Sequence, residues 1–169
     1  MNTRFLACWL LGAWIAGSLF MILVATQNFR SVDRLLAAPA SASLQVAKLG
    51  PGEARTFLRY QVSEQNRFYF ETWEKIQLAL ALATLAALTG GGRLALIFAG
   101  IMTALLLAES FYLTPEIVRL GRLIDFVPQA APSPERDHFW KLHGAYSGVE
   151  LVKLALGFFV SGRLILGRR

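Results

Sequence analysis

One apolar run, from Phe5 to Ala25, contains no charged residue. A helix rises about 1.5 Å per residue, and crossing the hydrocarbon core of a bilayer takes about 20 apolar residues. The run is therefore long enough to cross a membrane as one helix. A cleaved secretory signal has a shorter apolar region followed by a small-residue cleavage motif, and no convincing Ala-x-Ala motif follows this run. We therefore expect a retained membrane-spanning helix.

The rest of the chain also contains long runs of apolar residues. Charged residues make up 17% of the sequence, hydrophobic residues 55%, and the mean hydropathy is +0.47. A soluble domain has about 25% charged residues. The charges leave several long apolar runs bare, which predicts an all-α polytopic membrane protein with four transmembrane helices in an antiparallel bundle. The predicted spans are residues 5–25, 68–89, 94–114 and 143–166.

The connections predict how the spans are arranged within a single membrane domain, residues 1–169. Residues 90–93 contain three glycines and form a very short link, which makes spans two and three antiparallel neighbours. Two longer loops, residues 26–67 and 115–142, then lie together on the other side. Within the first loop, Phe57 and Tyr60 share a helix face, which favours an amphipathic helix on the membrane surface.

The distribution of basic residues sets the expected orientation. The side that carries the termini has arginines and no acidic residue, whereas the loop side has more basic residues spread over longer segments with many acids. Basic residues near span ends favour the cytoplasm, so their density predicts a multi-pass protein of the cell membrane with cytoplasmic termini. The raw count of basic residues, which is higher on the loop side, would favour the opposite orientation. Aromatic residues cluster at the loop-side span ends, as expected for an interfacial belt: Phe68, Tyr69, Phe70, Trp73, Phe111, Tyr112, Phe139, Trp140 and Tyr146.

The net charge of +6 and the isoelectric point near 10.0 do not indicate nucleic-acid binding. Nucleic-acid domains gather Lys and Arg on one solvated face, whereas here these residues flank apolar runs and would meet lipid headgroups. Cys8 is the one cysteine, so the chain cannot form an internal disulfide or a cysteine metal cluster.

Ionisable residues within the spans are the main candidates for a functional site. They are Glu74, Glu109, Glu150 and Lys153, all in the loop-side half of their spans. Such residues are costly in lipid and face a protein interior or a wet cavity. One interpretation is that they pair with one another for structural reasons. The other is a polar pocket for a proton, a cation or a small polar ligand, and the excess of carboxylates favours a proton or a cation.

The two histidines do not predict a cofactor. His138 and His143 are five residues apart and do not share a helix face, and no other span has a histidine that could complete a haem site. His143 and Glu150 do share a face, so a metal site there is conceivable, but an interfacial histidine is the favoured interpretation. We therefore expect no cofactor and no bound metal.

Small residues recur at four-residue spacing, which lets helices approach closely. We expect helix-packing faces at Gly12 and Ala16 and at Gly144 and Gly148. Ala13 with Gly17 and Gly157 with Ser161 have the same spacing. The spacing does not distinguish packing inside the chain from packing against a partner subunit.

The sequence lacks the phosphate-loop, dinucleotide-binding, serine-hydrolase and zinc-protease motifs of common enzymes. The leading hypothesis is therefore a non-enzymatic accessory or scaffold subunit, working as a homo-oligomer or within a larger membrane complex. The alternative is a carrier or binding protein for a proton, cation or small polar ligand. A membrane enzyme ranks third, because no nucleophile–base pair is visible.

Two short motifs resemble a known family. They are YLTPEIVRL, at Tyr112 to Leu120, and FWKLHGAYSG, at Phe139 to Gly148. Together with the charge-free first span, they resemble an uncharacterised bacterial four-helix membrane family related to a eukaryotic transmembrane protein linked to cisplatin resistance. The resemblance implies the four-helix architecture and no established reaction. The chain departs from that family in its long first loop and in carrying Glu150 and Lys153 in span four.

Overall fold

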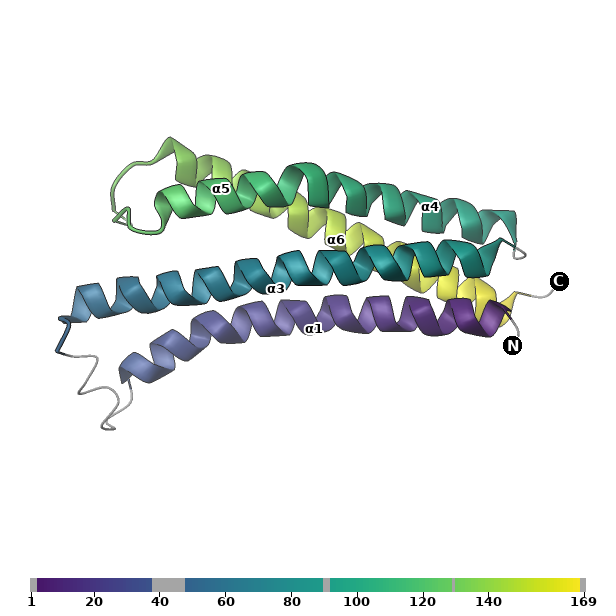
Figure 1. The fold of residues 1–169 in the computed structure, drawn as a ribbon, viewed down its shortest axis with the longest axis horizontal. Helices are drawn as coiled ribbons and strands as arrows, with labels where there is room; N and C mark the ends of the chain where they lie inside the picture. The colour runs from purple at the N-terminus through teal and green to yellow at the C-terminus, as the bar shows by residue number, and fades with distance from the viewer. Residues whose placement is uncertain (1–2, 38–47, 90–91, 129, 168–169) are drawn as a thin grey trace.

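A computed structural model describes residues 3–37, 48–89, 92–128 and 130–167, and these residues form helices and no strands (Figure 1). Because α4, η1 and α5 follow one another without a break, the chain has four long helical segments. The elements are α1 (Thr3–Ala37), α3 (Pro51–Leu88), α4 (Arg93–Ala108), the π-helix η1 (Glu109–Leu113), α5 (Thr114–Ile124) and α6 (Pro134–Leu166).

The four segments lie side by side along their lengths (Figure 1). Helix α1 packs against α3 and α6, and α4 packs against the same two helices. The two ends of the chain meet at one end of the molecule, where the Arg4 guanidinium donates hydrogen bonds to the carbonyls of Leu164 and Gly167, at 2.8 and 2.9 Å. We call this the terminal end, and the opposite end the loop end.

Two of the helical segments are long and apolar enough to cross a membrane, by length and composition. They are Thr3–Ala37 and Arg93–Ile124. They contain the first and third predicted spans. Helices α3 and α6 contain the second and fourth, but their apolar stretches are interrupted by charged residues such as Glu74 and Lys153.

The helices extend well beyond the predicted spans into the expected loops. Helix α1 continues to Ala37, and α3 begins at Pro51 and runs unbroken to Leu88, so the amphipathic stretch is the first half of α3 rather than a separate helix. Proline at the first helical position suits a helix start, and Gly50 precedes it at φ 82°. The predicted turn at residues 39–43 lies outside the described residues.

The second expected loop, residues 115–142, is also mostly helical. Helix α5 covers its first part, and α6 begins at Pro134. Ser133 caps α6, because its hydroxyl accepts a hydrogen bond from the Arg136 backbone N–H at 3.2 Å. The apolar runs predicted the central part of each helix, and an amphipathic helix was expected within residues 26–67. The continuation of α1 to Ala37 and the length of the helices within residues 115–142 were not predicted, because these stretches carry no apolar run.

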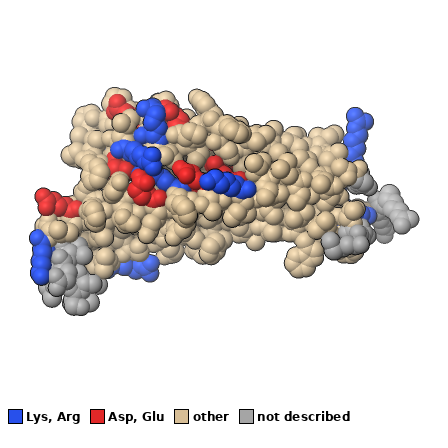
Figure 2. Space-filling view, in the orientation of Figure 1, with Lys and Arg blue, Asp and Glu red and all other residues tan. Residues whose placement is uncertain are grey.

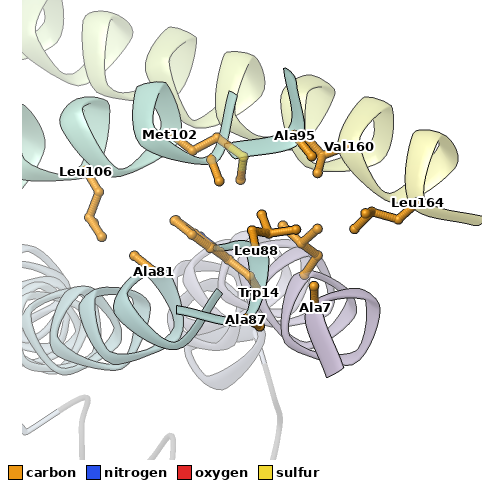
Figure 3. Packing of buried hydrophobic residues seen from close by; sticks show 12 residues of the cluster. Ala7, Trp14, Ala81, Ala87, Leu88, Ala95, Met102, Leu106, Val160 and Leu164 are labelled. Carbon is orange, nitrogen blue, oxygen red and sulfur yellow. The ribbon is translucent and has the colours of Figure 1, made fainter. Parts of the chain in front are cut away.

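The interior of the terminal half is apolar. Trp14, Leu88 and Met102 point toward one another from α1, α3 and α4 (Figure 3). The buried apolar cluster comprises Ala7, Leu11, Trp14, Ala81, Ala87, Leu88, Ala95, Ala99, Met102, Leu106, Val160 and Leu164.

Two of the predicted small-residue pairs are exposed in the described structure, and the other two each include a closely packed glycine. Gly12, Ala16, Gly144 and Gly148 are all exposed, and no atom lies within 4 Å of a Cβ built on any of the three glycines. Close packing occurs in the other two pairs, first at Gly17, where a Cβ would lie 2.0 Å from the Trp73 ring. It also occurs at Gly157, which contacts Ile15 and Met102.

The π-helix η1 shifts the inner face of its segment by one residue. Buried residues along α4 recur every three or four positions through Leu106 and Glu109, and the next buried residue is Thr114, five positions on. The Thr114 backbone N–H correspondingly bonds to the Glu109 carbonyl, an i to i−5 bond. Pro115 has no N–H to continue the α-helical pattern. Both Glu109 and Thr114 therefore face inward.

A candidate site built on a buried lysine and three glutamates

Lys153 lies at the centre of the molecule, with 1% of its surface exposed. It projects from the inner face of α6, together with Gly157 and Val160 further along the helix. Its ammonium donates to Glu109 on η1, to Glu150 Oε1 one turn back on α6 at 2.9 Å, and to Gln77 Oε1 on α3 at 2.9 Å. An ammonium has three donors, so Lys153 is fully hydrogen-bonded.

Gln77 connects three helices at this site and is completely buried. Its carbonyl oxygen accepts from both Lys153 and the Trp14 indole N–H, the latter at 2.8 Å. Its amide nitrogen donates to Glu150 Oε1 at 3.2 Å. The pattern of donors and acceptors fixes the orientation of the amide group and ties α1, α3 and α6 together.

The carboxylates differ in how completely they are satisfied. Glu150 Oε2 accepts from the Ser18 hydroxyl at 3.4 Å, and its Oε1 accepts from Lys153 and Gln77. Glu109 is completely buried, and its Oε1 has no hydrogen-bond partner in the part of the chain that the structure describes. A buried carboxylate oxygen without a partner is costly.

Glu74 lies one helical turn before Gln77 on the same face of α3, and is 7% exposed. It accepts a hydrogen bond from the Thr114 hydroxyl rather than from Lys153. The structure thus brings Glu109, Glu150 and Lys153 into one network and leaves Glu74 beside it.

The charge of this buried cluster does not balance. Lys153 is the one ammonium facing Glu74, Glu109 and Glu150 among the described residues, so three ionised carboxylates would leave an excess of two negative charges. Transferring an uncompensated charge from water into a protein interior is strongly unfavourable. Protons or a bound cation must therefore neutralise part of the excess.

Lys153 contacts Glu109 and Glu150 directly, and Gln77 bonds to both Lys153 and Glu150. Glu74 bonds instead to Thr114, and the four charged side chains do not line an open cavity among the described residues. The small space beside Lys153, bounded by Trp14, Ser18 and Met102, has no room for a water molecule. No group of three metal-ligating residues suited to a metal ion occurs among the described residues. His143, the conceivable metal ligand, instead stacks on Phe139 with ring centroids 5.7 Å apart.

A second charged group lies at the loop end, between α3 and α5. Arg67 bonds to Glu64 on its own helix and to Asp125, at 2.9 Å, just after α5. Arg122 also reaches Glu64, at 3.4 Å. Gly121 makes room, because a Cβ there would lie 2.8 Å from the Arg67 guanidinium.

The pKa values of the two carboxyl groups in this loop-end cluster are shifted in opposite directions. The hydrogen bond from Arg122, aided by Arg67, holds the pKa of Glu64 below its usual value. Burial raises the pKa of Asp125 despite its bond to Arg67. Both groups hold α5 against α3, and neither contacts Lys153 in the described structure.

Sequence reasoning selected Glu74, Glu109, Glu150 and Lys153 but missed their uncharged partners. Those partners are Trp14, Ser18, Gln77 and Thr114. Gln77 could have been found, because it lies three residues after Glu74 on the same helix face. Thr114 could not, because the π-helix changes the spacing that places it there. Tyr146 is buried rather than part of the predicted interfacial belt.

The sequence matches no family model, no curated protein and no solved structure. The resemblance suggested by the motifs at residues 112–120 and 139–148 therefore stays a prediction, and the function has to be argued from the site.

Proposed function

We propose that the chain is a four-span membrane protein that takes up and releases a proton at the cluster of Glu109, Glu150 and Lys153. The single observation that carries the proposal is the unbalanced charge of this buried cluster. Glu109 and Glu150 bond to one ammonium, and a third carboxyl group, Glu74, lies buried beside them. The most deeply buried of the three, Glu109, has an oxygen without a partner among the described residues.

The outer surface supports four spans rather than two. Besides the aromatic residues at the loop-side span ends, large apolar side chains within the predicted spans are exposed on all four segments. Figure 2 shows charged residues concentrated toward the loop end. A polar interior inside an apolar exterior suits lipid. These exposed residues are Phe5, Trp9, Leu19, Phe20, Ile22 and Leu23 on α1, Ile76, Leu78 and Leu82 on α3, Leu94, Ile97, Ile101 and Leu107 on α4, and Leu151, Val152, Phe158, Phe159, Ile165 and Leu166 on α6.

The lengths of α3 and α6 are also sufficient. At about 1.5 Å per residue, the 38 residues of α3 extend about 57 Å and the 33 residues of α6 about 50 Å. A hydrocarbon core is about 30 Å thick, so each helix would project from the membrane. The projecting part is the loop end, where Arg67, Arg122 and their partners lie.

A proton fits the cluster better than a metal cation does. Calcium takes six to eight oxygen ligands and magnesium six, whereas the Lys153 ammonium already takes one oxygen each from Glu109 and Glu150. The free Oε1 of Glu109 is a single ligand atom. One oxygen atom suffices for a proton, which needs no surrounding cavity.

Infrared difference spectroscopy tests the proton site. The chain is reconstituted in phosphatidylcholine vesicles, and the carbonyl band of protonated carboxyl groups is compared between acid and alkaline pH. We expect a pH-dependent band that disappears in Glu109→Gln and persists in the control Glu116→Gln, whose side chain lies on α5 outside the cluster. A spectrum that is the same in wild type and Glu109→Gln would refute the proposal.

Cysteine accessibility tests the four spans. In a Cys8→Ser background, single cysteines at Leu49 and Ala131 mark the loop end and one at Gly92 marks the terminal end. A membrane-impermeant maleimide should label the first two from one side of the membrane and the third from the other. Labelling of all three from one side would exclude four spans.

A role as an accessory subunit is the second candidate, and one surface feature favours it. An open apolar groove of about 440 Å³ lies along α1, lined by Phe5, Cys8, Trp9, Gly12, Ala13 and Ala16. The Trp9 side chain beside it is 79% exposed. Purification in mild detergent at native expression level, followed by mass spectrometry, tests this role. A stoichiometric partner lost in Gly12→Leu would support it, and a lone monomer would exclude it.

A further inference from the structure

Tyr146 is a buried polar residue that the cluster itself does not use. It lies on α6 one turn before Glu150, is 8% exposed, and packs edge-on against Phe70 with ring centroids 5.9 Å apart. Its hydroxyl has no hydrogen-bond partner of acceptable geometry within the described residues. Its ring partner Phe70 lies one turn before Glu74 on α3, so Tyr146 lies on the loop side of both Glu74 and Glu150.

The interior differs on the two sides of Lys153. Toward the terminal end, the inner faces are apolar, and Ala81 and Leu88 on α3 belong to the same buried cluster as Val160 and Leu164 on α6 (Figure 3). The hydroxyls of Thr84 and Ser161 lie buried in that half, and neither has a hydrogen-bond partner in the described structure. The buried Thr103 hydroxyl donates to the Ala99 carbonyl of its own helix, at 2.8 Å. Isolated hydroxyls do not form a chain along which a proton could move.

Toward the loop end, the interior stays polar. Beyond the Lys153 network come Glu74 with Thr114, and then Asn66, which accepts a hydrogen bond from Asn28 at 2.8 Å. Asn66 lies next to Arg67 of the loop-end cluster. Buried polar groups thus recur between the cluster and the charged end of the molecule, and the Phe70–Tyr146 ring pair lies between Glu74 and Asn66.

We infer that the cluster exchanges its proton with the loop end alone, and that the Tyr146 hydroxyl relays the proton between Glu74 and Glu150. The inference rests on the proposed proton site and adds the end of the molecule from which a proton reaches that site. In the relay, the O–H bond of a protonated Glu74 breaks and its proton bonds to the tyrosine oxygen. The original tyrosine hydrogen passes to Glu150, so the phenol is unchanged at the end.

The titratable groups facing this route come from three elements. Helix α3 supplies Glu74, η1 supplies Glu109, and α6 supplies Tyr146, Glu150 and Lys153. Helix α1 contributes only Trp14 and Ser18 to the described network, and neither titrates in the ordinary pH range.

Sided pH jumps test the inference. The chain is inserted in one orientation into phosphatidylcholine vesicles, and the external pH is lowered rapidly while the carboxyl infrared band is recorded. With the loop end outside, the band should rise at once. With the terminal end outside, it should rise only after a protonophore is added. An equally rapid rise in both orientations would overturn one-sided access.

The relay is tested by Tyr146→Phe, which removes only the hydroxyl. A positioned side chain accelerates proton transfer by about 10²-fold or more, so we expect the band to rise about 10²-fold more slowly to the same final height. The matched control is Tyr112→Phe, at an exposed tyrosine, which should leave the rate unchanged. An unchanged rate in Tyr146→Phe would overturn the relay. Absence of any Glu109-dependent band in wild type would instead overturn the proton site itself.

Discussion

The Lys153 ammonium on α6 lies 2.9 Å from the Gln77 side-chain oxygen on α3, and that same oxygen accepts the Trp14 indole N–H from α1. One uncharged acceptor therefore joins three helices around a buried cation. The lysine is held by neutral and charged partners together, and its carboxylate partners are left with more negative charge than it neutralises.

Removing the ammonium should be strongly destabilising. Lys153→Met leaves Glu109 and Glu150 buried without their cation, and breaking a buried ion pair costs about 3–5 kcal/mol. The free energy of unfolding, measured in detergent, gives the loss of stability. Lys75→Met, at an exposed lysine on α3, is the control and should change stability by less than about 0.5 kcal/mol. Adding Glu109→Gln to Lys153→Met should recover part of the loss, and strictly additive effects would contradict a direct coupling.

The contact between α1 and α3 should depend on Gly17. A Cβ at this position would lie 2.0 Å from the Trp73 ring, so Gly17→Ala should lower the free energy of unfolding by about 1–3 kcal/mol. Gly12→Ala on the same helix has no atom within 4 Å and should be neutral or stabilising by about 0.5–1 kcal/mol. Equal stability of the two variants would show that the helices do not approach this closely.

The loop-end cluster should control the titration of Glu64. The Arg122 hydrogen bond is the largest cause of its lowered pKa, so Arg122→Gln should raise the pKa of Glu64 toward its usual value. Carbon-13 nuclear magnetic resonance of the Glu64 carboxyl group measures this shift. Arg119→Gln, which removes a bond to Glu116 instead, should leave the pKa of Glu64 unchanged. An unchanged pKa in Arg122→Gln would contradict the assigned cause.

The same shift has a consequence for stability. A lowered folded-state pKa means that the unfolded chain binds the proton more readily, so Glu64 stabilises the fold above its usual pKa. This contribution is lost as the pH falls through the lowered value. When the free energy of unfolding is measured at decreasing acid pH, it should therefore fall less steeply in Arg122→Gln than in wild type. An identical slope would contradict the link between Arg122 and Glu64.

Much of the helical content followed from the sequence because long apolar runs are a strong local signal. The run from Phe5 to Ala25 lies within α1, and the run from Leu94 to Thr114 lies within the segment Arg93–Ile124. The polar half of α3 was expected as an amphipathic helix, from Phe57 and Tyr60, but its continuity with the second span was not. The polar half of α1 was not predicted, because contacts such as Asn28 with Asn66, and no apolar run, mark it as part of the helix.

The site was predictable only in its charged members. Ionised groups inside apolar runs are conspicuous, so Glu109 and Lys153 stand out in the sequence, and the structure brings them together. Which oxygen each donor reaches depends on helix rotation, and the π-helix at Glu109–Leu113 alters that rotation without a recognisable motif. The burial of Tyr146 could not be predicted either, because an aromatic residue near a span end suits a membrane interface equally well.

The central claim is that this buried cluster binds a proton, and counting protons tests it most directly. Wild type and Glu109→Gln are titrated potentiometrically in the same phosphatidylcholine vesicles, made permeable to protons, with and without sodium. The cluster predicts that wild type takes up one more proton per chain than Glu109→Gln, whether or not sodium is present. Equal uptake by the two chains, or uptake that sodium suppresses, would contradict a proton site.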